Sequence, residues 1–505
     1  MKIFTTDDLK AIHRKTIETD GVSSRELIGR VAEGVVREIT SHWRPTKRVA
    51  VFAGSGNNGA DALIVAKMLQ EQGFKPDVFL FNIGGKSLSA DCRACRDELL
   101  QLPDLHFTEV IDNFNLPVLS SQWLVIDGLF GWGLTMPLSG GFVSLVRYIN
   151  ESRATVISID VPSGLFGEWN PQSINRNIIH ANLTMAIQSP RISFLLADNA
   201  ELVGDWKLLD IGLNQDVLRT TPSKYHLIEG ADIRRLLVPR PEFCSKADFG
   251  DALLVAGSYG MMGAAVLAAR GALRAGAGKV SVYSARCAYN VLQTAVPEAM
   301  FIPDKHDIAV TNINPGRTFT AVGLGPGLGT HDATVNALDT FIKQNDKHPL
   351  VIDADALNCI ARRRDMLNHL PPLSILTPHA GEFDRLFDQC ATHEKRLLKA
   401  VEVSAAYNVL ILLKGHYSAL VRPDGKIYFN SSGNPAMATP GSGDVLTGVL
   451  TALLAQGYKP EVASLISMYV HGLAGDLAAE TQGDFGVTAG DIAANIGKAF
   501  NLIMK

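Results

Sequence analysis

Two glycine-rich segments that each contain an aspartate are the parts of this 505-residue chain best suited to chemistry. Residues 54–61 read GSGNNGAD and residues 439–444 read TPGSGD, and each segment leads into an apolar helical pattern. The first N–H groups of a helix have no partner within the helix and lie at the positive end of its dipole. Loops of this kind hold phosphate groups. We therefore expect two separate anion-binding sites in one polypeptide.

Short apolar runs that alternate with helical patterns must position these two segments. The first series of expected strands covers residues 48–53, 77–82, 123–127, 155–160, 183–187 and 207–211. The second series covers residues 252–256, 279–283, 320–323, 350–353, 374–377 and 409–413. Such alternation is typical of a mainly parallel sheet with helices on both faces, so we expect an α/β protein. The polar stretch Asn214–Lys224 separates the two series, and we place one domain over residues 1–217 and another over residues 225–505.

Aspartates follow two of the expected strands in the first domain. Asp127 comes directly after the run 123–126, and Asp160 comes directly after the run 156–159. In an open parallel sheet, ligands bind at the carboxyl ends of the strands. Each aspartate taken alone could equally be a turn former or a helix cap. Acidic strand ends would repel an anionic ligand, so we expect a bound cation to balance them.

The composition limits the class of protein. With 47% hydrophobic residues, 19% charged residues and a net charge of −4, the chain is expected to fold and to have no overall attraction for nucleic acid or an anionic membrane. Residues 1–10 lack the apolar core of a signal peptide, and the longest apolar stretches read as too short to span a bilayer. Six cysteines suit a reducing compartment, and we interpret Cys92 and Cys95 as surface or half-buried thiols. We predict a cytoplasmic protein without nucleic-acid or membrane partners.

Three motifs carry a family resemblance in the first domain. They are GSGNNGAD at 54–61, DGLFGWGL at 127–134 and SIDVPSGL at 158–165, and through them residues 1–215 resemble the NAD(P)H-hydrate epimerase family. The resemblance implies a Rossmann-like three-layer αβα domain that interconverts the R and S forms of a nicotinamide hydrated at C6. It implies a potassium ion bound by Asn58, Asp127 and Ser163, and Asp160 as the acid/base. The dinucleotide contacts that it implies, with Asp160 among them, are Asn57, Asn58, Gly59, Ala60, Asp61, Gly131, Trp132 and Gly133.

The sequence departs from the family at several of these positions. Ala60 and Ala62 stand where glycine is usual, Trp132 stands where a small polar residue is usual, and Met136 stands where arginine is common. An added Cβ can block the close approach of the backbone to a pyrophosphate. An alternative interpretation of this domain is therefore a non-catalytic module for binding or oligomerisation.

A larger set of motifs carries a second resemblance over residues 245–491. It resembles the ribokinase-like fold, and within it the ADP/ATP-dependent NAD(P)H-hydrate dehydratases. The motifs include GMMGAAVLAA at 260–269, GLGPGLG at 323–329, DADAL at 353–357, TPHAGEF at 377–383, LKGHYS at 413–418 and GNPAMATPGSGD at 433–444. The resemblance implies that Asp444 deprotonates the C6 hydroxyl, which attacks the terminal phosphoryl group of ADP or ATP, and that phosphate elimination restores the nicotinamide. The residues implied to contact the hydrate are Ala264, Gly327 and His379, and those implied to contact the nucleotide are Lys414, Gly415, His416, Tyr417, Ser418, Gly443 and Asp444.

Alternatives remain open for several of these residues. His379 could be a satisfied histidine at a strand end, the loop at 325–329 could simply need positive φ angles, and His471 reads as a packing residue. The GSGD motif also serves small-molecule kinases of the same fold, acting for example on a vitamin precursor or a sugar alcohol. The TPHAGEF and GMMGAAVLAA segments favour the dehydratase. We expect Mg²⁺ with the nucleotide, because a transferring phosphoryl group needs its charge neutralised, and the resemblance implies a homo-oligomer.

Overall fold

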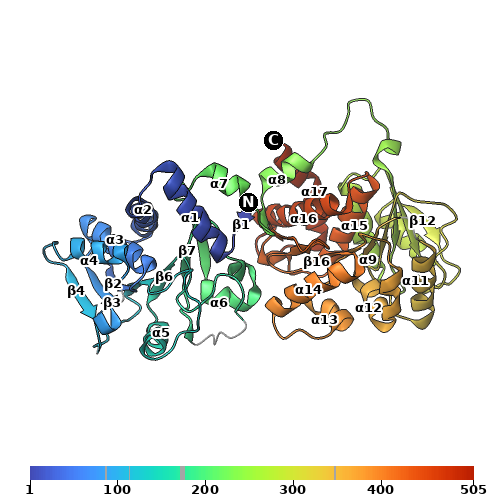
Figure 1. Cartoon of the computed structure of the whole chain (residues 1–505). Coiled ribbons are helices and arrows are strands. Elements are labelled where there is room, and N and C mark those ends of the chain that lie inside the picture. The colour runs from blue at the N-terminus through green and yellow to red at the C-terminus, as the bar shows by residue number, and fades with distance from the viewer. Residues whose placement is uncertain (86–87, 113, 171–176, 346–347) are drawn as a thin grey trace. The chain divides into compact units, whose positions relative to one another are not determined.

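A break between Ser223 and Lys224 divides the computed structural model into two units, Lys2–Ser223 and Lys224–Lys505, with Met1 grouped with the second (Figure 1). The break falls at the end of the polar stretch Asn214–Lys224. The structure describes residues 1–85, 88–112, 114–170, 177–345 and 348–505. Each unit has its own sheet and its own cores.

In the sheet of the N-terminal unit, the loops that follow β2 and β5 begin side by side. Its strands pair in the order β4-β3-β2-β5-β6-β7-β8, and each neighbouring pair is parallel. The chain builds outward from β2 and then returns to β5 on the other side of β2, with Ala53 in register with Gly128. Ligands bind at such a point of reversal in an open α/β sheet. The strands of this sheet are β2 (Arg48–Ala53), β3 (Pro76–Phe81), β4 (His106–Val110), β5 (Trp123–Gly128), β6 (Thr155–Ile159), β7 (Leu183–Ile187) and β8 (Asp205–Leu209), and the short strand β1 (Lys2–Ile3) is not one of them.

Alternate residues of these strands enter two different cores, which confirms the predicted three-layer arrangement. Val49 and Val51 pack with α1, α2, α3 and α4, whereas Ala50 and Phe52 pack with α5 on the other face. Figure 1 shows α2 and α5 on opposite sides of the sheet. Cys92 and Cys95 are fully buried in the first of these cores, which corrects the expectation that they lie at or near the surface. The helices are α1 (Thr6–Asp20), α2 (Ser24–His42), α3 (Asn57–Glu71), α4 (Ala90–Leu99), α5 (Gly141–Glu151), α6 (Ala200–Val203) and α7 (Gln215–Thr220).

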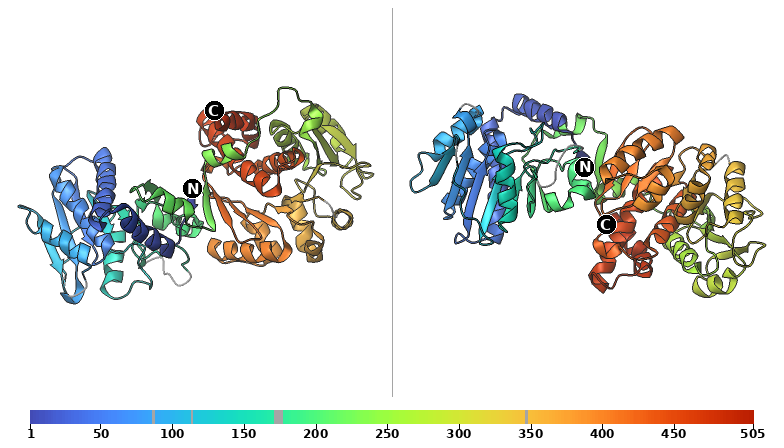
Figure 2. Two further views of the ribbon diagram at one scale, coloured as in Figure 1. Left: turned by 45° about the horizontal axis from the view of Figure 1, so that its top comes forward. Right: turned by 90° about the horizontal axis from the view of Figure 1, so that it is seen from below.

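The C-terminal unit contains a long mixed sheet, which can be followed in both views of Figure 2. From β9 onward the strand order is β9-β18-β17-β16-β15-β14-β13-β10-β11-β12. Strand β17 is antiparallel to both of its neighbours, whereas the run from β16 to β12 is parallel. The strands are β9 (Tyr225–Ile228), β10 (Asp251–Val255), β11 (Lys279–Ser284), β12 (Met300–Pro303), β13 (Ala321–Leu324), β14 (Leu350–Ile352), β15 (Ile375–Leu376), β16 (Leu410–Leu413), β17 (Ala419–Val421) and β18 (Ile427–Asn430).

Helices cover both faces of this sheet, with α16 and α14 on opposite sides of it in Figure 1. The helices are α8 (Gly230–Leu236), α9 (Met262–Arg274), α10 (Ala288–Ala295), α11 (Asp332–Gln344), α12 (Ala354–Arg362), α13 (Ala380–Phe387), α14 (His393–Tyr407), α15 (Ser442–Ala455), α16 (Pro460–Gln482) and α17 (Ala489–Met504).

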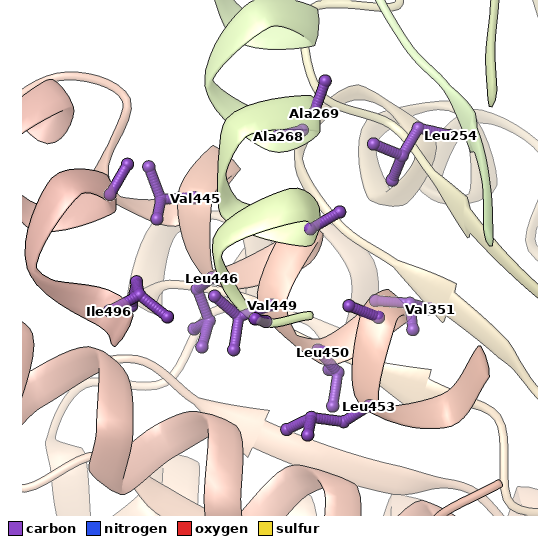
Figure 3. Close-up of a cluster of buried hydrophobic side chains, with 14 of the residues drawn as sticks. Leu254, Ala268, Ala269, Val351, Val445, Leu446, Val449, Leu450, Leu453 and Ile496 are labelled. Atoms are coloured by element: carbon purple, nitrogen blue, oxygen red, sulfur yellow. The ribbon is translucent and has the colours of Figure 1, made fainter. Parts of the chain in front are cut away.

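Helix α15 is fixed by close packing against α9. A Cβ on Gly448 would lie 2.0 Å from the carbonyl oxygen of Ala268, so the two helix backbones touch at that point. Figure 3 shows Val449 and Leu450 of α15 beside α9 in the same buried cluster. Close-packed interiors resist displacement. The first turn of α15, which carries Asp444, is thereby held in one place.

One helix is longer and more apolar than the sequence led us to expect. By length and composition α16, with 23 residues, could cross a membrane, which corrects the expectation that no apolar stretch reaches that length. Inside the unit, however, 61% of its most apolar window is buried. His471 of this helix is buried and has Nε2 at 2.9 Å from the Ser442 carbonyl oxygen. The contacts of α16 are those of a core helix.

Candidate active sites

The loop between β2 and α3 folds directly onto the start of the helix. A Cβ on Gly59 would lie 1.8 Å from the carbonyl oxygen of Gly54, so a side chain at that position is excluded. Ala60 and Ala62 are fully buried, and the Ala62 methyl group packs against Gly128. Both methyl groups therefore point away from the open side of the loop. The steric argument for a non-catalytic module has no basis at these two positions.

Two adjoining hollows lie beside this loop. The first, called here the Asp160 cavity, has a volume of about 310 Å³, and the second, called the loop groove, has a volume of about 600 Å³. Residues 55–58, 129–139 and Phe142 line the loop groove together with Lys10. Because both hollows share Lys10, Asn57, Asn58 and Trp132, one ligand can extend from one into the other.

Asp160 lines the Asp160 cavity and has an unusual backbone conformation. Its φ of +68° is left-handed, which costs energy for a residue with a side chain and is commonest at functional sites. Its Oδ1 accepts a hydrogen bond from Arg191 Nη2 at 2.5 Å, and its Oδ2 accepts one from the Trp132 backbone N–H at 2.9 Å. Both side chains of the ion pair are almost completely buried. The arrangement fixes one carboxylate in the wall of the Asp160 cavity.

Two further titratable groups line the Asp160 cavity. Burial lowers the pKa of His13 to about 4, with Asp160 opposing the shift and Arg191 adding to it, so this imidazole is neutral. The His13 ring lies 5.0 Å from the Trp132 ring. Burial, followed by the negative charges of Asp160 and Asp91, raises the pKa of Asp61 well above its usual value. The Asp61 carboxyl group faces the same space as Asp160.

Asp127 and Ser163 form a buried pair behind the loop groove. Ser163 Oγ lies 2.5 Å from Asp127 Oδ1 and 3.1 Å from the Phe130 carbonyl oxygen. Asp127 Oδ2 accepts hydrogen bonds from Ser158 Oγ at 2.8 Å and from the Ser163 N–H at 2.9 Å. Burial raises the pKa of Asp127, although these hydrogen bonds oppose the shift. The Asn58 side chain lies against Gly131, and its nitrogen is buried without a hydrogen-bond partner among the described residues.

In the C-terminal unit, Asp444 occupies the first turn of α15 beside other acidic groups. Burial, and then the negative charge of Asp353, raise the pKa of Asp444 to about 7, while Lys414 opposes the shift. Asp355 and Glu382 add further negative charge. A carboxylate whose pKa lies near neutrality can accept and release a proton under ordinary conditions.

A buried network holds Lys414 beside the glycine-rich turn. Lys414 Nζ donates a hydrogen bond to Asp353 Oδ1 at 2.7 Å and lies 3.6 Å from Glu382 Oε2. Thr447, one turn after Asp444, donates to Asp353 Oδ2 at 2.6 Å. Burial alone would lower the pKa of Lys414, but Asp353 and Glu382 outweigh it, so the pKa is raised. The ammonium group is permanently charged at neutral pH.

A cavity of about 540 Å³, called here the Lys414 cavity, opens next to this network. Of the residues expected to contact the nucleotide, Lys414, Gly415, His416, Ser418 and Gly443 line it. Asp444, which follows Gly443, and Tyr417 are not among the lining residues, and the Tyr417 ring packs edge-on against His416. Residues 432–435 line the same cavity. The Asn434 side chain and the Gly433 N–H in this segment donate to Asp476 at 2.8 and 3.0 Å.

The three residues expected to contact the hydrate lie at two places. A Cβ on Gly327 would lie 2.9 Å from the Ala264 Cβ, so these two positions adjoin. His379 caps α13, accepting a hydrogen bond from the Gly381 N–H at 3.0 Å, and its Nε2 lies 3.4 Å from Glu382 Oε1. Glu382 in turn faces Lys414. His379 is thus connected to the Asp444 site through Glu382 and Lys414. It also caps a helix, with its Nδ1 accepting a hydrogen bond.

Comparisons with known proteins cover both units. A family model described as NAD(P)H-hydrate dehydratase matches residues 252–498, and one described as YjeF-related protein N-terminus matches residues 24–193. A bifunctional NAD(P)H-hydrate repair enzyme Nnr from Thermofilum pendens is 31% identical over 519 residues, covering 100% of this chain and 97% of the relative. The chain belongs to the family of bifunctional NAD(P)H-hydrate repair enzymes.

Further comparisons agree with membership of the NAD(P)H-hydrate repair family. The Moorella thermoacetica member is 32% identical over 513 residues, covering 97% of this chain and 95% of the relative. A crystal structure of a ribokinase-like superfamily protein from Enterococcus faecalis matches 56% of this chain and 98% of its own, with 25% identity and a TM-score of 0.50. The predicted ribokinase-like fold of the C-terminal unit is confirmed.

Sequence reasoning missed several residues that the repair-enzyme structure brings to the two sites. His13 and Arg191 carry no motif, and the fold alone places them beside Asp160. Asp353 follows β14 as Asp160 follows β6, so the strand-end pattern used for Asp160 could have identified it. Gly59 and Ala60, expected as dinucleotide contacts, line neither hollow beside the loop.

Proposed function

We propose that this chain repairs hydrated nicotinamide cofactors at two sites. The N-terminal unit interconverts the R and S forms of NAD(P)H hydrate, and the C-terminal unit dehydrates the S form while ADP is cleaved to AMP and phosphate. Family membership over the whole chain supports this pairing. The observation that carries it is that each unit holds an aspartate, buried at Asp160 and partly buried at Asp444, close to a glycine-rich helix start whose residues line a cavity.

In the C-terminal unit, Asp444 acts as the base. Its carboxylate accepts the proton of the C6 hydroxyl, and the hydroxyl oxygen attacks the terminal phosphoryl group of the nucleotide, releasing AMP when ADP is used. Phosphate then leaves C6 and a proton leaves C5, which restores the C5–C6 double bond. Lys414 and the N–H groups at the start of α15 stabilise the charge of the transferring group. The adenine nucleotide lies in the Lys414 cavity.

We propose that Mg²⁺ enters with the nucleotide. Among the residues that the structure describes, no three His, Cys, Asp or Glu side chains converge as a metal site. Mg²⁺ is commonly bound by one or two carboxylates together with substrate phosphates, so the acidic groups around Asp444 fit it in that form. When bound it would neutralise phosphate charge during the transfer.

In the N-terminal unit, Asp160 acts as the proton shuttle. The pyrophosphate lies in the loop groove near the start of α3, and the hydrated ring lies in the Asp160 cavity. Epimerisation at C6 passes through a ring-opened or dehydrated intermediate, and either route requires a group that takes up and returns a proton. Asp160 is positioned by Arg191 and by the Trp132 N–H to do this.

The proposed function is tested with a racemic mixture of NADH hydrates, ADP, Mg²⁺ and K⁺, by following the return of nicotinamide absorbance. Complete recovery requires both activities, because only the S form is dehydrated directly. Recovery that stops near half would show a working dehydratase and an inactive epimerase. No recovery would point to a small-molecule kinase in place of the dehydratase.

We propose that K⁺ binds between Asn58, Asp127 and Ser163. If the Ser163 proton is donated to the Phe130 carbonyl, an Asp127 oxygen becomes free for an ion, and K⁺ is held by oxygen ligands. We expect potassium chloride to raise the melting temperature above that in choline chloride of equal strength, because a bound ion stabilises the folded state. Asn58→Ala should abolish this difference. Equal stabilisation of both proteins would contradict the proposed site.

The raised pKa of Asp444 predicts the pH dependence of dehydration. A base must be ionised to accept a proton, so kcat/KM should fall about tenfold per pH unit below a pKa of about 7 and level off above it. Initial rates with the S hydrate and saturating ADP, measured from about pH 5 to about pH 9, test this. A rate that is flat across this range, or that falls as the pH rises, would contradict the role of Asp444 as base.

The remaining expectations stay predictions. All six cysteines are free, which suits a reducing compartment, and we propose a cytoplasmic location. The homo-oligomer implied by the family resemblance is also proposed, and size measurement in solution would test it.

A further inference from the structure

Arg191 is a buried charged group with donors to spare. It follows β7, its side chain is among the largest fully buried ones, and it lines the Asp160 cavity. Nη2 is engaged with Asp160, but Nε and Nη1 are buried and have no hydrogen-bond partner within the described chain. A guanidinium carries five N–H donors and stays protonated in proteins. The folded chain therefore satisfies only part of this group.

Unsatisfied donors on a buried charge are costly and need an explanation. The Trp132 ring lies 5.8 Å from the guanidinium carbon and offers its face, a contact that does not supply a hydrogen-bond acceptor in the plane of the guanidinium. His13 is neutral and packs against the same ring. The missing acceptor is thus to be sought in a ligand of the Asp160 cavity.

The lining of the cavity limits what that acceptor can be. Ile17, Leu27 and Ile28 form an apolar wall, which suits a flat heterocycle. The carboxyl groups of Asp61 and Asp160 face the same space, and a second anion beside Asp160 would be repelled. A neutral carbonyl oxygen can accept N–H bonds without adding charge. The cavity therefore favours an uncharged ring that carries a carbonyl group.

We infer that Arg191 donates from Nη1 to the carboxamide oxygen of the hydrated nicotinamide while Nη2 holds Asp160. This inference rests on the proposed epimerase function. The carboxamide is on C3, across the ring from C6, so its contact with Arg191 fixes which way round the ring enters. The Arg191 side chain then orients both the substrate ring and Asp160, the proposed proton shuttle.

The test uses the full chain with Arg191→Lys, which keeps a positive charge near Asp160 but loses the planar fork. We expect the KM for the R hydrate in epimerisation to rise about 10- to 100-fold, the usual effect of losing hydrogen bonds from a charged group. Arg147→Lys is the matched control. Arg147 also has a buried, unpaired Nε, but it lines none of the hollows described above, so its KM should not change.

A sulfur analogue separates the carboxamide contact from general damage. The hydrate of reduced thionicotinamide adenine dinucleotide places a weak acceptor where the oxygen would be, so the wild-type chain should show a raised KM for it. In Arg191→Lys the same replacement should add little, because the contact is already absent. Additive effects, or an unchanged KM in Arg191→Lys, would overturn the inference while the wild-type chain still epimerises. A wild-type chain that dehydrates only the S form would overturn the epimerase function itself, and the inference with it.

Discussion

Replacing Asp444 with asparagine is expected to lower kcat for dehydration of the S hydrate by about 10²- to 10⁴-fold, the range that a positioned general base contributes. Asparagine has nearly the same shape but cannot accept the proton of the C6 hydroxyl. The neighbouring Lys414 is charged and cannot serve as a base in its place. The measurement is the return of nicotinamide absorbance from purified S hydrate with ADP and Mg²⁺.

Two controls separate loss of the base from loss of the fold. Asp339→Asn removes a carboxylate on α11 that pairs with Lys343 and Arg363 and does not line the Lys414 cavity, so this variant should keep the wild-type rate. Asp444→Asn should also keep interconverting R and S hydrates, because the epimerase site lies in the other unit. Dehydration by Asp444→Asn within a few-fold of wild type would exclude Asp444 as the base.

Central strands were predictable because their residues are buried on both faces. The apolar runs that became β2, β5, β10 and β14 read directly as strands, since helices cover both sides of them. Sequence reasoning missed strands that lack a continuous apolar run. β4 alternates exposed and partly buried residues at one edge of its sheet, and β12 is half-exposed at the edge of the other. Strands β17 and β18 are short and form an antiparallel hairpin within an otherwise parallel series.

The candidate sites show a similar division between local and non-local information. Asp127, Asp160 and Asp444 were found because each occupies a recognisable place, at a strand end or a helix start, inside a motif. Arg191 was missed because nothing in its neighbourhood marks it. The pairing of β6 with β7 brings it back to Asp160 across 31 residues. Contacts of this kind depend on sheet order, which a single sequence does not encode locally.

Replacing Asp160 with asparagine is expected to reduce interconversion of R and S hydrates by about 10²- to 10⁴-fold while leaving dehydration of the S form intact. An amide can neither take up nor return the proton, so recovery from a racemic mixture should stop near half. The direct measurement is chromatographic separation of the R and S hydrates after incubation without ADP. Asp77→Asn, which changes a carboxylate at the start of β3 paired with His106, is the control and should epimerise normally.

The Asp160 variant needs a check on folding, because the change leaves Arg191 as a buried charge without its partner. Breaking a buried ion pair on one side costs about 3–5 kcal/mol, enough to unfold a marginal domain. Arg191→Met combined with Asp160→Asn removes both charges and should recover much of that loss in thermal stability without restoring activity. Recovered stability in the double variant would assign the stability loss to the unpaired charge of Arg191. The lost epimerisation is then assigned to Asp160 from the single variant, measured at a temperature where it is folded. If Asp160→Asn is folded and still epimerises, Asp160 is not the proton shuttle, and the N-terminal unit then either uses another acid such as Asp61 or acts only as a binding module.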